Sequence, residues 1–218
     1  MIKADHKKWA RFIFDIYITR ELKNKFNRFI LVNEFPEIEP GSSLLILPNH
    51  FSWWDGFFID YYTKHFIKRK IHLLMLEEQL KRYWFFKKVG AYSINPDNAK
   101  STFESLQYTA EVLNDLDNFV VYYPQGKIEQ YEKRPPLFKP GVLKVLENSK
   151  LKTNVLPVGF KISYSENKLP DVFVRSGKMI SVAPRENSFE LIRTEFTNNL
   201  SLLDEFSPGE KSIDLFTL

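Results

Sequence analysis

The chain has 218 residues, 44% of them hydrophobic, and its 31 basic and 27 acidic residues give a net charge of +4. This length and apolar content exclude a disordered polymer and fit a single α/β unit, while the small positive charge does not choose among an anionic membrane surface, nucleic acid and a polyanionic cofactor. The absence of cysteine excludes disulfides and a thiolate nucleophile and fits a reducing compartment, and four histidines without zinc-ligand spacing predict no metal site.

The sequence shows no targeting or membrane-spanning segment. Met1 is followed by charged residues instead of an apolar core, and no apolar run approaches the roughly 20 residues that cross a bilayer. We expect a protein that is soluble or lies on a membrane surface.

Residues 7–32 predict an aromatic-rich helix. Its apolar residues at three- and four-residue spacing are Trp9, Phe12, Ile13, Ile16 and Tyr17. Two interpretations stay open: an interfacial helix with its apolar face in lipid, or a helix packed against its own domain. Prolines 36 and 40 end the pattern. We therefore divide the chain into an amphipathic segment (1–35), an α/β domain (36–206) and an irregular tail (207–218).

Strands and helices alternate after this segment. The predicted strands are 43–48, 71–76, 119–123, 155–162, 172–174 and 180–182, with an extended piece at 90–94. The predicted helices are 55–67, 77–88, 99–116, 140–148 and 188–206. The alternation predicts one α/β domain with a central mixed or mostly parallel sheet flanked by helices. Pro157 inside a strand favours an edge position for that strand.

The first predicted strand ends in a polar, aromatic turn, Asn49-His50-Phe51-Ser52-Trp53-Trp54-Asp55-Gly56. Residues five apart diverge on a helix, so His50 and Asp55 meet only if a turn leading into a helix separates them. Ser52 and Asp55 suit such a turn because both can cap a helix start. A carboxylate on one ring nitrogen orients an imidazole as a general base, which could activate a hydroxyl. The alternative is a turn in which both side chains only cap backbone.

A second strand, 119–123, runs into Pro124-Gln125-Gly126-Lys127. Ligands gather at strand carboxyl ends in α/β sheets, so we expect Gln125 to hydrogen-bond a substrate and Lys127 to face an anion. The alternative is a plain Pro–Gly turn with a solvated lysine. Downstream, Arg134 and Lys139 belong to a basic, aromatic loop that either grips a phosphate or acyl carrier or covers the core.

Together these blocks resemble the glycerolipid acyltransferases, the lysophosphatidate acyltransferase-like family. Residues 49–55 resemble the family's N-H-x-x-x-x-D block, and Pro124-Gln125-Gly126 resembles its F-P-E-G-T-R block. Leu156-Pro157-Val158 is similar to the fourth, V-P-V-like block, and Gly90 with Ile94 fits the second. The order and spacing match over about residues 40–165.

The resemblance implies an O-acyltransferase of lipid metabolism and phospholipid biosynthesis. A fatty acyl group would pass from an acyl thioester, acyl-CoA or acyl-carrier protein as co-substrate, to a hydroxyl or amine of a lipid or small acceptor. No further cofactor is implied. His50 would be the base that Asp55 orients. The implied substrate-binding residues are Asn49, Ser52, Pro124, Gln125, Gly126, Lys127, Arg134 and Lys139.

The departures from the family pattern concern the acceptor. Gln125, Lys127 and Ile128 replace the family's Glu, Thr and Arg, and Pro96 aligns with the arginine of its second block. Those arginines are taken to bind the acceptor phosphate, which suits the bidentate guanidinium. We therefore do not expect a standard lysophosphatidate as acceptor.

Several roles stay open on the sequence alone. The Gly126 amide is a candidate oxyanion donor, and Ser52 is either a turn cap or, less simply, a nucleophile. One aromatic group either lines an acyl groove or packs the core: Trp53, Trp54, Phe57, Phe58, Tyr61 and Tyr62.

Rival functions are an acyl-thioester hydrolase and a catalytically degenerate membrane- or lipid-binding module, the latter favoured by the altered Gln125 and Lys127. Nucleic-acid binding is not expected because the basic residues are spread without a reading helix. We expect a cytoplasmic protein held peripherally on the inner face of a membrane.

Overall fold

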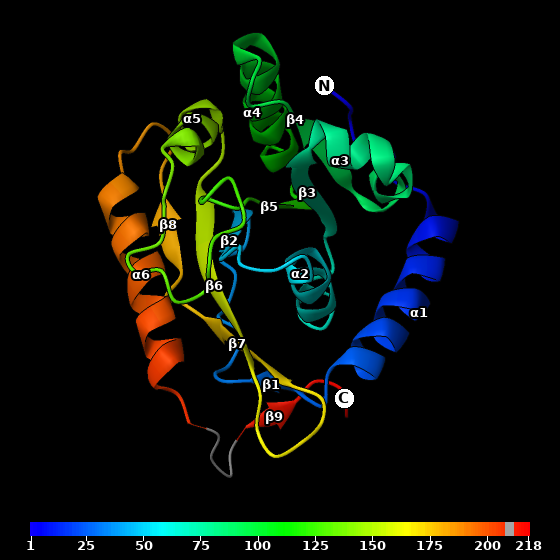
Figure 1. Ribbon diagram of the computed structural model, residues 1–218. Helices are drawn as coiled ribbons and strands as arrows, with labels where there is room; N and C mark the ends of the chain where they lie inside the picture. Colours follow the sequence, from blue (N-terminus) through cyan, green and yellow to red (C-terminus); the bar gives the residue numbers. More distant parts are fainter. Residues whose placement is uncertain (208–211) are drawn as a thin grey trace.

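The computed structural model describes residues 1–207 and 212–218, and within them nine strands form one sheet with helices on both faces (Figure 1). The sheet order is β4-β3-β5-β2-β6-β7-β1-β9, with β8 beside β6. The strands are β1 (Phe29–Leu31), β2 (Ser43–Pro48), β3 (Lys70–Leu76), β4 (Ala91–Ile94), β5 (Asn118–Val121), β6 (Thr153–Ser163), β7 (Asp171–Ser176), β8 (Ile180–Val182) and β9 (Ile213–Asp214). The helices are α1 (Lys8–Lys25), α2 (Asp55–Thr63), α3 (Glu77–Arg82), the 3-10 helix η1 (Trp84–Val89), α4 (Ala99–Leu113), α5 (Gly141–Asn148) and α6 (Phe189–Glu205).

The sheet is mixed and mostly parallel, as the alternation of elements predicts. Strands β4, β3, β5, β2 and β6 run parallel to one another, and β1 runs parallel to β7. Antiparallel pairs join β6 to β7 and β8, and β1 to β9. Because β2 and β5 are adjacent and parallel, their carboxyl ends meet at one edge of the sheet.

Side chains that alternate along β2 build the two cores. Leu44 and Ile46 belong to the core under α1 and α2, whereas Leu45 and Leu47 belong to the core under α4, α5 and α6. Burial on both faces explains why this strand is continuously apolar. Each such side chain stabilises the fold by about 1.5–3 kcal/mol, so the residues next to the site rest on a firmly held strand.

The N-terminal helix is shorter than predicted. It ends at Lys25, and Phe29–Leu31, which we predicted as helical, form a strand parallel to β7. A short apolar run is compatible with either structure, and its neighbours in the sheet decide. The predicted irregular tail also contributes a strand, since Ile213–Asp214 pairs with β1; residues 208–211 of that tail lie outside the described residues.

The prediction that Pro157 marks an edge strand is wrong, because β6 lies between β2 and β7. Pro157 pairs with Leu47 of β2 on one side. On its other side it falls between the end of the β8 pairing at Val155 and the start of the β7 pairing at Val158. The Pro157 carbonyl points to this gap and accepts the Gly177 amide at 2.8 Å. No strand pairs with β6 at the gap, so the N–H that proline lacks removes no hydrogen bond between strands.

The predicted helix 77–88 is divided into α3 and η1. After η1 the chain turns at Gly90, which has φ +116°, and a Cβ there would lie 2.1 Å from the carbonyl oxygen of Ile71. Only glycine lets β4 start this close to β3. The other predicted elements are present, with ends that differ by at most four residues.

Candidate active site

The turn between β2 and α2 brings His50 and Asp55 together. The distance from His50 Nδ1 to Asp55 Oδ2 is 2.8 Å. The same carboxylate oxygen accepts the amides of Phe51 at 2.7 Å and Ser52 at 2.9 Å. The five-residue separation thus closes because the chain wraps around the carboxylate before α2 begins at Asp55.

Burial differs sharply within this pair. The Asp55 side chain is 0% exposed, whereas that of His50 is 25% exposed. Burial raises the pKa of Asp55, and the hydrogen bonds from His50 and the two amides oppose that effect. An ionised Asp55 carboxylate can only accept, so it selects the tautomer of a neutral imidazole in which Nδ1 carries the proton and Nε2 presents a lone pair. The imidazole is therefore oriented by a covered carboxylate and reachable from solvent.

Two other residues of this turn hold its shape. The hydroxyl oxygen of Ser52 accepts the Trp54 amide at 3.1 Å, which is a turn-capping contact. The buried side chain of Asn49 donates to the Phe160 carbonyl at 2.9 Å and accepts the Phe160 amide at 2.8 Å. Asn49 thus fixes the end of β2 to β6. Both polar atoms of its side chain contact the Phe160 backbone, where we predicted a contact with a substrate.

Gln125 is buried against the His50 backbone and does not face solvent as a substrate-binding side chain would. It is 4% exposed, and its Oε1 accepts the His50 amide at 2.5 Å. Its Nε2 donates to the His50 carbonyl at 3.3 Å and to Glu129 Oε2 at 3.1 Å. These contacts occupy the side-chain amide, which replaces the predicted substrate contact by a contact with the His50 backbone.

The remainder of the second turn is close to a lysine. Gly126 has φ +68° and donates its amide to the Tyr123 carbonyl at 3.1 Å, so that amide serves the turn and not an oxyanion. A Cβ at this position would lie 2.9 Å from Lys139 Nζ. The Lys139 amide donates to the carbonyl of the buried Pro124 at 2.8 Å. Lys139 thus lies against the turn, and Lys127 is exposed beside it.

Arg134 is engaged elsewhere. Its guanidinium pairs with Asp204 of α6 at 2.8 Å and donates to the carbonyl of Tyr131, whose ring it covers at 4.8 Å from the centroid. Of the three cations predicted to contact a substrate, Lys127 and Lys139 lie at the second turn, whereas Arg134 is paired with α6.

Two residues near His50 were not singled out from the sequence. The Tyr123 ring lies 4.4 Å from the His50 ring, and burial raises the pKa of Tyr123 well above its usual value. Its hydroxyl has no hydrogen-bond partner among the residues that the structure describes. Glu129 is 6% exposed and reaches Gln125. Tyr123 closes an apolar strand and Glu129 is an isolated acid in a loop, so neither carried a pattern that points to the site.

An apolar hollow of about 290 Å³ opens beside the His50 turn, among α1, α2 and η1. Its lining residues are Ile13, Phe14, Tyr17, Trp53, Phe57, Tyr83, Phe85 and Phe86. The aromatic group of the sequence is thus divided. Trp53 and Phe57 face the hollow, while Tyr61 and Tyr62 are buried with their hydroxyls bonded to Leu215 O and Ser176 Oγ.

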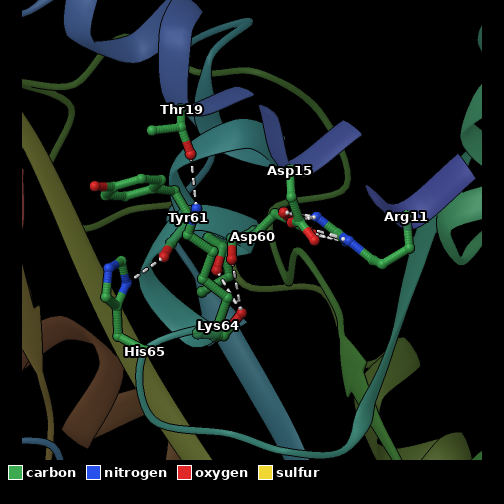
Figure 2. Close-up of polar contacts among 9 residues, drawn as sticks. Arg11, Asp15, Thr19, Asp60, Tyr61, Lys64 and His65 are labelled. Carbon is green, nitrogen blue, oxygen red and sulfur yellow. Dashed lines mark hydrogen bonds and ion pairs between the residues drawn. The ribbon is translucent and has the colours of Figure 1, made fainter. Parts of the chain in front are cut away.

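Helix α1, which forms one wall of this hollow, is fastened to α2 by charge. Figure 2 shows the guanidinium of Arg11 pointing toward the carboxylates of both Asp15 and Asp60. Its two hydrogen bonds to Asp60 are 2.7 and 2.6 Å long. In the same view Lys64, the residue that follows α2, donates to Thr19 of α1 at 2.8 Å. Two-point binding of a carboxylate by guanidinium gives a defined orientation, so the wall is held at a fixed angle.

The described residues contain no cluster of three potential metal-ligating His, Cys, Asp or Glu side chains. In the same portion of the chain, no helix combines the length and apolar character that crossing a membrane requires.

The fold and the site together define an α/β protein with an imidazole–carboxylate pair at the carboxyl end of a central parallel strand. A family model described as Acyltransferase matches residues 29–161, more than half of the chain, and the chain belongs to this family. This confirms the resemblance seen in the sequence.

A solved structure has a similar fold. It is titled the 1-acyl-sn-glycerophosphate (LPA) acyltransferase PlsC from Thermotoga maritima and aligns with a TM-score of 0.59 at 12% sequence identity. The alignment covers 89% of this chain and 83% of that one. None of the curated proteins matches the sequence.

Proposed function

We propose that this acyltransferase moves a fatty acyl group from an acyl thioester, acyl-CoA or acyl-carrier protein, to a hydroxyl or amine of a lipid or small acceptor. The observation that carries the proposal is the contact of 2.8 Å between a partly exposed His50 and a fully buried Asp55. The family assignment supplies acyl transfer, and this contact supplies a base for it.

In the proposed reaction, His50 Nε2 takes the proton of the acceptor as its oxygen or nitrogen attacks the thioester carbonyl. The tetrahedral intermediate collapses by breaking the carbon–sulfur bond, and the imidazolium returns the proton to the leaving thiolate. Asp55 stabilises the imidazolium between these steps. A positioned base of this kind raises the reaction rate by about 10²–10⁴-fold. The direct transfer needs no acyl-enzyme, which agrees with the engagement of Ser52 in its turn.

The cations near the second turn bear on the acceptor. Lys139 and Lys127 offer single ammonium groups where a phosphate-binding arginine would offer a planar fork. With Arg134 paired to Asp204, we propose an acceptor other than a standard lysophosphatidate.

The hollow beside Trp53 is suited to the acyl chain. Its aromatic and aliphatic lining favours a hydrocarbon, and Trp53 lies three residues after His50 in the same turn. We propose that the chain of the donor or acceptor enters between α1 and η1 while its reacting end faces His50.

The outer face of α1 supports peripheral binding at a membrane. The helix buries Ala10, Phe14, Ile18 and Leu22 against its own domain. Its opposite face exposes Trp9, Phe12 and Ile16, with Phe12 68% exposed. Ile13 and Tyr17 are also exposed but lie beside the hollow, between the two faces. The buried face agrees with the interpretation of a helix packed on its own domain, and the exposed face supports our proposal that the segment also contacts lipid. An exposed apolar stripe beside a hollow for acyl chains fits a lipid surface, and we propose the inner face of a membrane.

The proposed activity is tested with purified protein, liposomes carrying a cellular lipid extract, and radiolabelled acyl-CoA or acyl-carrier protein. We expect labelled acyl-lipid with the wild type and loss of about 10²–10⁴-fold in His50→Ala. His65→Ala is the matched control, since His65 contacts the Tyr61 carbonyl at 2.8 Å away from the pair. Retained turnover in folded His50→Ala would refute the base assignment. Release of labelled fatty acid alone would identify a hydrolase, and membrane binding without turnover a non-catalytic module.

Membrane binding is tested by co-sedimentation with the same liposomes. Phe12→Ser together with Ile16→Ser should release the protein into the supernatant. Phe103→Ser removes another exposed phenylalanine, from α4, and should not release it. Equal sedimentation of all three proteins would contradict a lipid-facing α1.

A further inference from the structure

Gln125 and Glu129 contact the backbone of His50 and leave its imidazole to Asp55. The Gln125 side chain faces the His50 peptide groups as a neighbouring strand would, accepting from the amide at 2.5 Å and donating to the carbonyl at 3.3 Å. The same carbonyl accepts the Glu129 amide at 2.9 Å. Three contacts thus hold the one residue whose side chain is proposed to move protons.

These contacts require an amide at position 125 and an oxygen acceptor at position 129. The His50 N–H needs an acceptor and therefore meets the oxygen of the Gln125 side-chain amide. The Glu129 carboxylate needs a donor and therefore meets the nitrogen of the same amide. A glutamate at 125 would lose both donated bonds and place two carboxylates about as close as the present contact of 3.1 Å. Two anions at that distance in a buried site repel strongly.

Glu129 remains an anion in this arrangement. Burial raises its pKa, but hydrogen bonds from Lys133, the Leu137 amide and Gln125 outweigh burial and lower the pKa to about 2. Its Oε2 accepts the Leu137 amide at 2.9 Å, and its Oε1 pairs with Lys133. Glu129 therefore ties the loop that follows the second turn to the amide that holds His50.

We propose that Gln125 and Glu129 form a positioning pair that fixes the backbone of His50 and so aims its imidazole at Asp55 and the acceptor; the inference rests on the proposed function of His50. Neither residue touches the reacting atoms. Gln125 acts on His50 directly, and Glu129 acts by orienting the Gln125 amide.

A double-mutant cycle tests this pair. Gln125→Glu should lower kcat about 10²-fold with little change in KM, because a displacement of the base costs about that much. Glu129→Gln should cost less, since its amide oxygen can still accept from Gln125 and the partly exposed Lys133 can turn away. In the Glu129→Gln background the loss caused by Gln125→Glu should shrink to about tenfold or less, because the carboxylate–carboxylate repulsion is gone. Gln130→Glu, the same change at an exposed neighbour, is the control and should behave as wild type.

A second readout does not depend on turnover. The ¹⁵N signals of the His50 ring, assigned by their absence in His50→Ala, report the Nδ1–H tautomer and the titration of the ring. Gln125→Glu and Gln125→Met should change the His50 signals and leave those of His65 unchanged. If no acyl transfer is found for the wild type, this measurement still tests the positioning pair separately from the proposed function.

Gln125→Met keeps the pair falsifiable if Gln125→Glu does not fold, since it removes the hydrogen bonds without adding charge. Wild-type kcat and unchanged His50 signals in folded Gln125→Met would overturn the proposal. Equal losses from Gln125→Glu in both backgrounds would overturn the role of Glu129.

Discussion

Two histidines of this protein make close ring contacts with opposite consequences. His50 follows β2 and pairs with Asp55 at 2.8 Å, while His72 within β3 lies 3.2 Å from His6 of the N-terminal segment, nitrogen to nitrogen. The partner of His50 is a carboxylate that only accepts, whereas the partner of His72 is a second imidazole. Partner and position, and not the residue type, decide which histidine can serve as a base.

The His6–His72 contact is a structural one. His72 is buried, and burial together with nearby His6 lowers its pKa to about 4. A hydrogen bond between two imidazoles needs one ring to donate and the other to accept, which two protonated rings cannot do. The segment containing His6 is also held by backbone bonds, since Ile2 exchanges hydrogen bonds with Ser93 of β4. The pair therefore seals this segment onto the sheet and needs to stay neutral.

The largest effect is expected when the charge of Asp55, the partner of His50, is removed. In Asp55→Asn, the side-chain oxygen can still accept from His50 and from the Phe51 and Ser52 amides, because one oxygen makes all three contacts. Acyl transfer should nevertheless fall about 10²–10⁴-fold, since the imidazolium loses its counter-charge. Because burial raises the pKa of Asp55, its charge is costly in the folded state, and the melting temperature should stay the same or rise. Near-wild-type activity of Asp55→Asn would show that the carboxylate partner does not distinguish His50 from His72.

A smaller effect is expected on stability at low pH. The unfolded chain protonates His72 near its ordinary pKa of 6.5, but the folded chain does so only near 4. Between these values the unfolded state binds more protons, so stability falls as the pH decreases, by on the order of 3 kcal/mol in total. The other charged and polar groups that face the His6–His72 pair are Lys70, Asp115, Asn118, Arg11 and Asp5.

Urea unfolding between pH 7 and pH 4.5 measures this slope. His72→Phe should flatten it and keep acyl transfer at neutral pH. Parallel pH dependences of the wild type and His72→Phe would show that the pair does not titrate as the structure requires.

The smallest effect concerns Ser52, which lies in the same turn as His50 and Asp55. Ser52→Ala removes the acceptor of the Trp54 amide and should cost about 1 kcal/mol or less in the free energy of unfolding. Acyl transfer should stay close to that of the wild type, since Asp55 keeps its other contacts. Loss of turnover without loss of stability would point to Ser52 as a nucleophile and away from His50 as the sole reactive group.

The sequence by itself determined the elements and the His50 turn. Continuous apolar runs such as 43–48 identified strands buried on both faces, and the order of the acyltransferase blocks identified the family. The five-residue spacing between His50 and Asp55 allowed a meeting because a strand end and a helix start lay on either side, but it left open a turn in which both side chains only cap backbone, and the contact itself came from the structure. These signals are local, and local patterns are what a sequence displays.

The tertiary structure alone decided the rest. Phe29–Leu31 became a strand because β7 and β9 lie on either side of it, and Pro157 fitted a central strand because its neighbours leave a gap there. Gln125 turned toward the His50 backbone because β5 runs beside β2, which brings residues 75 apart in the chain into contact. Contacts of this kind depend on which strands are adjacent, and adjacency follows from packing over the whole chain.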